Sequence, residues 1–166
     1  MIQIGILTIS NRASQGVYED KSGRLLNDII NEHTQWSTSK QAVIADDIDE
    51  IVTTLKEWSN QGLDLILTSG GTGFSPQDVT PEATLKVVDR LTPGIVEAVR
   101  AESLKITRHA MLSRAVAGIR SQTLIINLPG SPKAVKENMQ IILPILPHAL
   151  ALLSGDENAE KDHRSV

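Results

Sequence analysis

The sequence predicts an α/β fold in which a mostly parallel central sheet is flanked by helices. Short apolar runs rich in β-branched residues alternate with segments whose apolar residues recur at helical spacing. Strands that alternate with helices form parallel sheets covered on both faces. The chain has 166 residues and no internal repeat or linker. We therefore expect a single domain over residues 1–155 and a flexible polar tail over residues 156–166.

Four strands are predicted, at residues 2–9, 40–44, 63–68 and 123–128. The first helix is expected over residues 22–32, where apolar side chains fall on one face. The second begins after Asp46 or Asp47, since either aspartate can cap it, and it ends at Gly62.

The motif "TPEAT" is a strong helix start, with Thr80 as the N-cap and a proline directly after it. That helix is expected to reach residue 89. Two more helices are predicted over residues 94–105 and 132–153, and Pro144 and Pro147 should kink or divide the last one.

Composition and charge exclude several classes of function. A net charge of −4 argues against a general binder of nucleic acid or of membrane surfaces, because both require a basic footprint. The absence of cysteine excludes disulfides, thiolate metal sites and cysteine nucleophiles. The first residues, "MIQIGILTIS", have no basic region, and no apolar run is long enough to span a bilayer. We therefore expect a cytoplasmic protein.

Polar segments follow three of the predicted strands, at residues 10–14, 68–78 and 127–133. Ligands of open α/β sheets bind beyond the carboxyl ends of the strands. The segment "TSGGTGFSPQDVT" contains three glycines and matches neither the Walker A nor the dinucleotide fingerprint. Its backbone N–H groups could cradle an anion, and we expect ligand contacts from Ser69, Gly70, Gly71, Thr72 and Gly73. The alternative is a tight turn that needs glycine only for positive φ.

Asp78 follows this glycine loop, where a carboxylate would repel a phosphate unless a cation lies between them. Mg²⁺ binds proteins through one or two carboxylates together with substrate phosphates, so the pattern favours a magnesium site. Asp46 or Asp47 could supply a second acid, although capping alone explains either one. A purely structural role of Asp78, supporting the turn, also remains open.

Other polar candidates occur near the remaining strand ends. Ser113 and Arg114 in "MLSRAVAGIR" could offer a hydroxyl and a phosphate-binding fork, or could simply form a loop. Lys133, in the first turn of a helix, could meet an anion or could be a solvated surface residue. The four histidines show no ligand spacing and receive no role.

Four motifs together resemble one family: "SNRASQGVYEDKSG", "TSGGTGFSPQDVTPEAT", "MLSRAVAGIR" and "LIINLPGSPKAVKE". The chain is similar to the molybdopterin adenylyltransferases of molybdenum cofactor synthesis (MogA type) and to the homologous G domains of proteins such as gephyrin. The similarity runs from about residue 4 to residue 155. It implies a three-layer α/β fold and a trimer. It also implies transfer of AMP from Mg-ATP to the terminal phosphate of molybdopterin, with release of pyrophosphate.

The resemblance implies roles for individual residues. Asp78 and Asp46 match the essential carboxylates of the family, and Asp20 matches a position of less certain role. The implied ligand-contacting positions are the glycine loop, Ser113, Asn127, Pro129 and Gly130. Asn11 stands where relatives often carry aspartate, and Gln77 where arginine often precedes the motif aspartate. The loss of that arginine removes a phosphate-binding charge and could weaken substrate affinity.

Three functions are therefore compared. The adenylyltransferase is favoured because both acids are present. A catalytically silent pterin-binding or scaffolding module is the alternative, and a molybdenum insertase is disfavoured because such chains are much longer. A molybdenum insertase could instead be a downstream partner. Finally, two apolar helical segments, at residues 85–99 and 141–146, exceed what one sheet face can cover, so self-association is expected. The resemblance implies that the assembly is a homotrimer.

Overall fold

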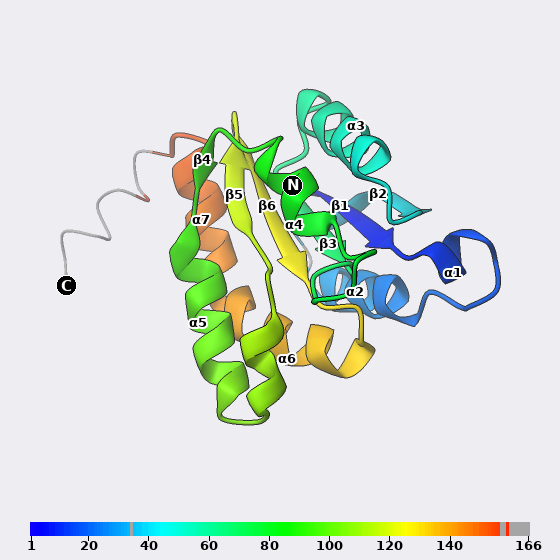
Figure 1. Cartoon of the computed structure of the whole chain (residues 1–166). Helices are drawn as coiled ribbons and strands as arrows, with labels where there is room; N and C mark the ends of the chain where they lie inside the picture. The colour runs from blue at the N-terminus through cyan, green and yellow to red at the C-terminus, as the bar shows by residue number, and fades with distance from the viewer. Residues whose placement is uncertain (34, 157–158, 160–166) are drawn as a thin grey trace.

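The computed structural model describes residues 1–33, 35–156 and 159 of the chain. A six-stranded sheet in the order β2-β1-β3-β6-β5-β4 forms its centre (Figure 1). Strands β1, β2, β3 and β6 are parallel, and β5 runs antiparallel to both of its neighbours. The expected α/β fold with a mostly parallel sheet is confirmed. The strands are β1 (Ile2–Ile9), β2 (Trp36–Ile44), β3 (Leu65–Ser69), β4 (Arg90–Leu91), β5 (Ala117–Arg120) and β6 (Thr123–Leu128).

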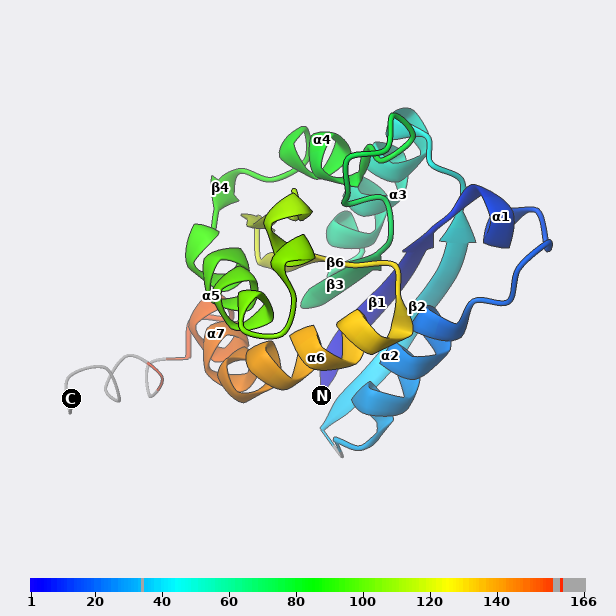
Figure 2. The same cartoon turned by 60° about the horizontal axis from the view of Figure 1, so that its bottom comes forward.

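Helices cover both faces of this sheet. Figure 2 shows α3 and α4 on one face and α2, α5, α6 and α7 on the other, which gives the three layers. The α-helices are α1 (Asn11–Ser14), α2 (Lys21–Asn31), α3 (Ile48–Asn60), α4 (Thr80–Leu85), α5 (Pro93–Leu104), α6 (Pro132–Ile142) and α7 (Leu146–Leu153). Two 3-10 helices, η1 (Arg108–Leu112) and η2 (Leu143–Ile145), complete the described helical elements.

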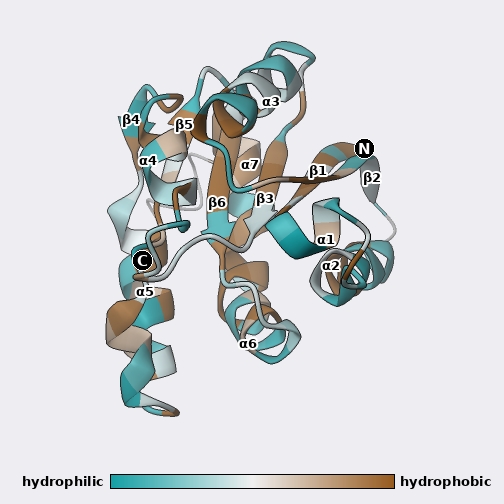
Figure 3. Cartoon of the chain, turned by 45° about the vertical axis from the view of Figure 1, so that its right-hand side comes forward, coloured by the Kyte–Doolittle hydropathy of each residue, from teal (hydrophilic) through white to brown (hydrophobic). Residues whose placement is uncertain are grey.

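The alternation of side chains along the central strands builds one core on each face of the sheet. Leu65 and Leu67 point into the core under α2, α6 and α7, whereas Ile66 points into the core under α3 and α4. Strand β6 behaves in the same way, with Ile126 on the first side and Ile125 on the second. These strands are buried along their whole length and are mostly apolar, because both faces of the sheet are covered (Figure 3).

Two differences from the predicted strands have a physical cause. Strand β2 begins four residues earlier than expected, because only Trp36 of "WSTS" is apolar and the three polar residues after it give no strand signal in the sequence. Strands β4 and β5 were not predicted, since β4 has only two residues and β5 contains a glycine. Strand β5 pairs back onto β6 across a short turn, where Ser121 adopts a φ of 53°.

The helices follow the sequence signals more closely. The expected division of the last helix is confirmed, because η2 separates α6 from α7 at the prolines. Thr80, predicted as an N-cap, is instead the first residue of α4, and Val79 occupies the cap without a side-chain bond. Helix α4 ends at Leu85, short of residue 89, because the chain turns there into β4. Most of the predicted tail lies outside the described residues, although Ala159 is buried.

Candidate functional site

The glycine loop leaves the carboxyl end of β3 and is held tightly by its neighbours. Gly70 and Gly71 have φ angles of 102° and 65°, which only glycine adopts easily. A β-carbon on Gly70 would overlap the Ile9 carbonyl, so β1 and the loop could not approach as they do. The Thr80 hydroxyl donates to the Gly70 carbonyl (2.8 Å), and the Thr80 N–H donates to the Gly71 carbonyl (3.1 Å). The backbone conformation therefore does require glycine at these two positions, as the turn interpretation expects. The bonds from Thr80 hold the loop beside the strand ends.

Asp46 lies against this loop at the end of β2. Its Oδ2 accepts a hydrogen bond from the Asn11 N–H (2.9 Å), and the Asp46 N–H donates to Asn11 Oδ1 (3.0 Å). The other carboxylate oxygen of Asp46 stands 3.2 Å from where a β-carbon on Gly71 would be. Asp47 instead caps α3, because its Oδ1 accepts from the Glu50 N–H (2.9 Å). The geometry thus separates the two adjacent aspartates: Asp47 caps, and Asp46 faces the loop.

Asp78 approaches the same loop from the opposite end. Its Oδ2 accepts a hydrogen bond from the Ser75 N–H (3.1 Å) and lies 2.8 Å from the position of a β-carbon on Gly73. The pKa of Asp46 is raised above its ordinary value of 3.8, mainly by burial. The hydrogen bond from Asn11 opposes this shift, and the negative charge of Asp78 adds to it. The two carboxylates therefore repel each other across one small site.

Two pockets adjoin at the glycine loop. The first, the acidic pocket, has a volume of about 440 Å³ and is lined by Asp20, Asp46, Ser69, Gly70, Gly71, Asp78 and Gly130, among others. The second, the apolar pocket, has a volume of about 280 Å³ and is lined by residues that include Thr72, Gly73, Ser113, Asn127 and Pro129. The pockets divide between Gly71 and Thr72 and again between Pro129 and Gly130. In the glycine loop and in the Pro129–Gly130 turn, neighbouring residues therefore line different pockets.

The Pro129–Gly130 turn is anchored from two sides. The Ser69 hydroxyl donates to the Pro129 carbonyl (2.9 Å), and the Ser22 hydroxyl donates to the Gly130 carbonyl (2.7 Å). Ser69 is thus a predicted ligand contact whose hydroxyl already has a protein acceptor. Ser69 lines the acidic pocket as the last residue of β3.

Several other predicted ligand contacts also have protein partners. The buried Asn127 amide donates to the hydroxyls of Thr68 (3.0 Å) and Thr84 (2.9 Å), and its Oδ1 accepts from the Val116 N–H (3.1 Å). Its geometry favours holding β6 to α4, and direct ligand contact stays a prediction. Lys133 is highly exposed and lies 4.0 Å from Glu137 Oε1, outside the linings of both pockets. A solvated surface role describes it best.

Asp20 has a clear structural use. Its Oδ1 accepts from the Gly23 N–H (2.8 Å), which caps α2, and its Oδ2 accepts from the Thr8 hydroxyl (2.8 Å). It lines the acidic pocket with both oxygens already engaged.

The two departures from the family pattern contact each other. The Asn11 amide donates to Gln77 Oε1 at 3.4 Å, which joins the segment that holds Asp46 to the residue before Asp78. A neutral amide pair therefore stands at the two positions where the motif resemblance implies an aspartate and an arginine.

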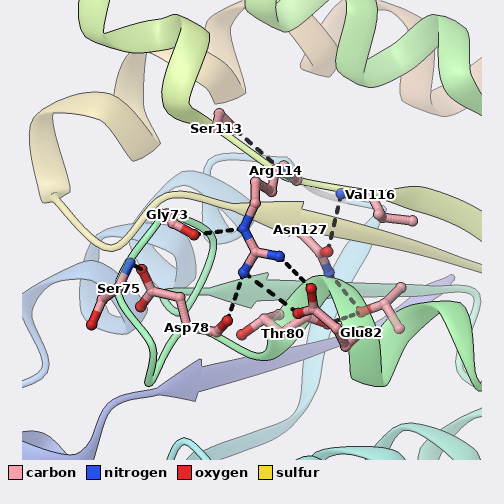
Figure 4. A network of polar contacts seen from close by, with 11 residues as sticks. Gly73, Ser75, Asp78, Thr80, Glu82, Ser113, Arg114, Val116 and Asn127 are labelled. Carbon is pink, nitrogen blue, oxygen red and sulfur yellow. Dashed lines mark hydrogen bonds and ion pairs between the residues drawn. The ribbon is translucent and has the colours of Figure 1, made fainter.

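Sequence reasoning missed the part of the apolar pocket formed by α5 and η1. Arg100 and His109 line it, together with apolar residues of both helices. The 3-10 helix η1 has no periodic signal, and nothing in the sequence indicates that it folds back over the end of β6. The structure also assigns Arg114 differently, because its guanidinium is directed at the glycine loop and α4 (Figure 4).

Within the described residues, no helix is long and apolar enough to cross a membrane. The described residues also contain no cluster of three or more histidine, cysteine or acidic side chains that could hold a metal ion.

The two acids and the glycine loop lie at the carboxyl edge of a mostly parallel α/β sheet, which is where such sheets bind their ligands. The family described as "Probable molybdopterin binding domain" matches residues 5–148. The chain belongs to this family. The resemblance noted from the motifs is confirmed.

Individual relatives agree with this placement. The chain is 42% identical over 157 residues to the molybdopterin adenylyltransferase of Helicobacter pylori strain J99, covering 93% of this chain and 89% of the relative. It is 43% identical over 173 residues to gephyrin of Dictyostelium discoideum, covering 98% of this chain but only 24% of gephyrin. Among solved structures, the molybdopterin biosynthesis enzyme MoaB of Thermus thermophilus superposes with a TM-score of 0.88 at 42% identity. That superposition covers 94% of this chain and 98% of the MoaB chain.

Proposed function

We propose that this chain is a molybdopterin adenylyltransferase of molybdenum cofactor biosynthesis. It joins AMP from ATP to the terminal phosphate of molybdopterin and releases pyrophosphate. Support comes from relatives of that name that match nearly the whole chain. The observation on which the proposal depends is the pair of adjoining pockets, with the glycine loop and two acids where they meet. A reaction that joins two large substrates needs such an arrangement.

The acids suit a magnesium nucleotide. Asp46 and Asp78 both line the acidic pocket, and their mutual repulsion contributes to the raised pKa of Asp46. A divalent cation beside both carboxylates would remove this repulsion, and Mg²⁺ binds through one or two carboxylates plus phosphate oxygens. We assign the triphosphate of ATP to the acidic pocket for this reason. When bound, Mg²⁺ supplies neutralisation of the charge that develops on the phosphates.

The protein contributes positioning and hydrogen-bond donors to the chemistry. A terminal phosphate oxygen of molybdopterin is already anionic, so its attack on the α-phosphorus of ATP needs no strong base. The bond from the α-phosphorus to the bridging oxygen breaks, and pyrophosphate leaves. The rigid loop from Gly70 to Gly73 holds the reacting groups where the pockets meet. Backbone N–H groups of the loop stabilise the phosphate charge, apart from that of Gly70, which already donates to the Leu128 carbonyl (3.1 Å).

The apolar pocket is the remaining place for molybdopterin. Its lining is largely apolar, with Arg100 and His109 at its α5 and η1 side. A flat heterocycle can pack there, while its phosphate reaches the boundary at Thr72 and Gly73. The product could then pass to a molybdenum insertase as a downstream partner.

The test is incubation of the purified protein with molybdopterin and Mg-ATP, followed by measurement of pyrophosphate and adenylylated pterin. We expect both products in equal amounts. Tight binding of molybdopterin without either product would overturn the proposal and identify a silent pterin-binding module.

A further inference from the structure

Arg114 joins the glycine loop to helix α4. Its Nε donates to the Gly73 carbonyl (2.7 Å), and its Nη2 donates to the Asp78 carbonyl (2.6 Å). Its Nη1 forms an ion pair with Glu82 in the first turn of α4. The backbone N–H of Arg114 also donates to the Thr72 carbonyl (2.9 Å). Figure 4 shows the guanidinium lying between the loop and the helix.

These contacts enclose the segment that carries Asp78. The base of the glycine loop is fixed by Thr80, whereas Phe74, Ser75 and Gln77 are exposed. Between Gly73 and Asp78, the hydrogen bonds within the segment are local ones, such as that from the Asp78 N–H to the Ser75 carbonyl (2.9 Å). Arg114 therefore holds both ends of an otherwise exposed segment.

We propose that Arg114 is a positioning residue that sets the place of the Asp78 carboxylate, with Glu82 orienting the guanidinium. This inference rests on the proposed function. It assigns a use to the "MLSR" motif other than a phosphate-binding fork, because each of the three guanidinium nitrogens already donates to a protein acceptor. Arg114 also bonds loop carbonyls on both sides of the boundary, since Gly73 lines the apolar pocket and Asp78 the acidic one.

Arginine is required because one planar side chain must reach three acceptors at once: the Gly73 carbonyl, the Asp78 carbonyl and the Glu82 carboxylate. A guanidinium presents five donors in a fixed plane, whereas the lysine ammonium is a compact point charge. Arg114→Lys keeps the positive charge near Glu82 and loses the simultaneous contact with both carbonyls. This variant therefore separates geometry from charge.

Hydrogen–deuterium exchange tests the positioning role without any turnover. In Arg114→Lys, amides of the segment 72–78 should exchange about 10-fold faster or more, because charge-assisted hydrogen bonds to its carbonyls are lost. Arg120→Lys is the matched control, since Arg120 also donates to a carbonyl, that of Val87 (3.2 Å), outside the linings of both pockets. Unchanged exchange in Arg114→Lys, or equal changes in both variants, would overturn the inference.

Turnover supplies the second readout. We expect kcat of Arg114→Lys to fall about 10- to 100-fold, as expected for a displaced reacting group. The Mg²⁺ concentration at half-maximal rate should rise, which a merely structural role would not cause. An unchanged magnesium dependence would contradict the inference. Glu82→Gln, at the half-exposed start of α4, should show the same changes more weakly, and it decides the matter if the lysine variant does not fold.

Failure of the proposed function can be told apart from failure of the Arg114 inference. If the unaltered protein forms no adenylylated pterin, the adenylyltransferase assignment falls. The exchange comparison then still decides whether Arg114 holds the Asp78 segment.

Discussion

Asp46 and Asp78 are placed by different means, although both approach the glycine loop. Asp46 is held by two reciprocal hydrogen bonds with Asn11, a residue that follows the end of β1. Asp78 is fixed by its own turn, through Ser75. Each aspartate has one carboxylate oxygen bound to a backbone N–H. Arg114 adds to this at Asp78, because it holds the backbone of the segment that carries that carboxylate.

Replacing Asp78 with asparagine should abolish most adenylyl transfer and leave the fold intact. The substitution keeps the size of the side chain and removes the charge that would face Mg²⁺. We expect kcat to fall about 100- to 1000-fold, the usual effect of losing one electrostatic contact to the transition state. The measurement is pyrophosphate release under saturating substrates, with circular dichroism to check folding.

The same assay separates the neighbouring acids at the end of β2. Asp46→Asn should be as damaging as Asp78→Asn, whereas Asp47→Ala should mainly weaken the cap of α3, by about 1 kcal/mol. Near-normal turnover in Asp78→Asn, or a larger loss of turnover at Asp47 than at Asp46, would contradict the assignment.

Gly71→Ala should impair both stability and ligand binding. Its φ of 65° costs an alanine roughly 1–2 kcal/mol, and the new β-carbon would overlap the Thr80 hydroxyl. Gly62→Ala is the matched control, because Gly62 has a φ of 83° and nothing within 4 Å of a new β-carbon. Thermal unfolding should show a loss in both variants, and binding of Mg-ATP by calorimetry should fail only for Gly71→Ala. Equal binding of Mg-ATP by the two variants would mean that Gly71 is needed only for the turn and not for ligand binding.

At the scale of elements, α4 and the segment before β5 are joined by the Arg114–Glu82 pair. Burial alone would raise the pKa of Glu82, but the hydrogen bond and charge of Arg114 outweigh it and lower that pKa below 4.5. The unfolded chain then binds protons at a higher pH than the folded one. The pair stabilises the fold above pH 4.5, and this contribution is lost as the pH falls through the lower folded value.

This linkage gives a prediction with a definite sign. The free energy of unfolding, measured in urea, should fall more steeply below pH 4.5 for the unaltered protein than for Glu82→Gln. The pair is partly exposed, so the difference should be small and should shrink in high salt. Parallel pH profiles in the two proteins would show that the pair does not contribute.

The elements that could be predicted from the sequence are those with strong local signals. Strands β1 and β6 are rich in isoleucine and leucine, and their bounds agree with the prediction. The elements that could not be predicted depend on tertiary pairing: β4 exists because Arg90 and Leu91 meet β5, and η1 lacks any period. The acids and the glycine loop were visible as a motif. The pairing of Asn11 with Gln77 and the use of Arg114 were not, because both join residues far apart in the sequence.

At the scale of the whole molecule, the apolar residues are only partly covered within one chain. Of those that led us to expect a trimer, Val87, Ile142 and Leu146 are buried inside the subunit. Leu91 and Ile145 are exposed. Helix α5 has no buried residue, although half of its sequence, "PGIVEAVRAESL", is apolar. Further exposed apolar side chains on α4, on α5 and in the segment that follows α5 are Leu85, Leu104, Ile106, Met111 and Leu112.

This uncovered surface supports self-association, and we predict a homotrimer with each site formed mainly within one subunit. Large apolar patches on soluble proteins normally mark interfaces. Sedimentation equilibrium at micromolar concentration should give the mass of three chains of 18.0 kDa each. Leu91→Glu should lower that mass, because a charge placed in an apolar interface loses its hydration without a partner. Lys86→Glu, an exposed change of charge near the same sheet edge, serves as the control and should leave the mass unaltered. A single-chain mass for the unaltered protein would contradict the trimer and would show that these apolar residues stay exposed to solvent.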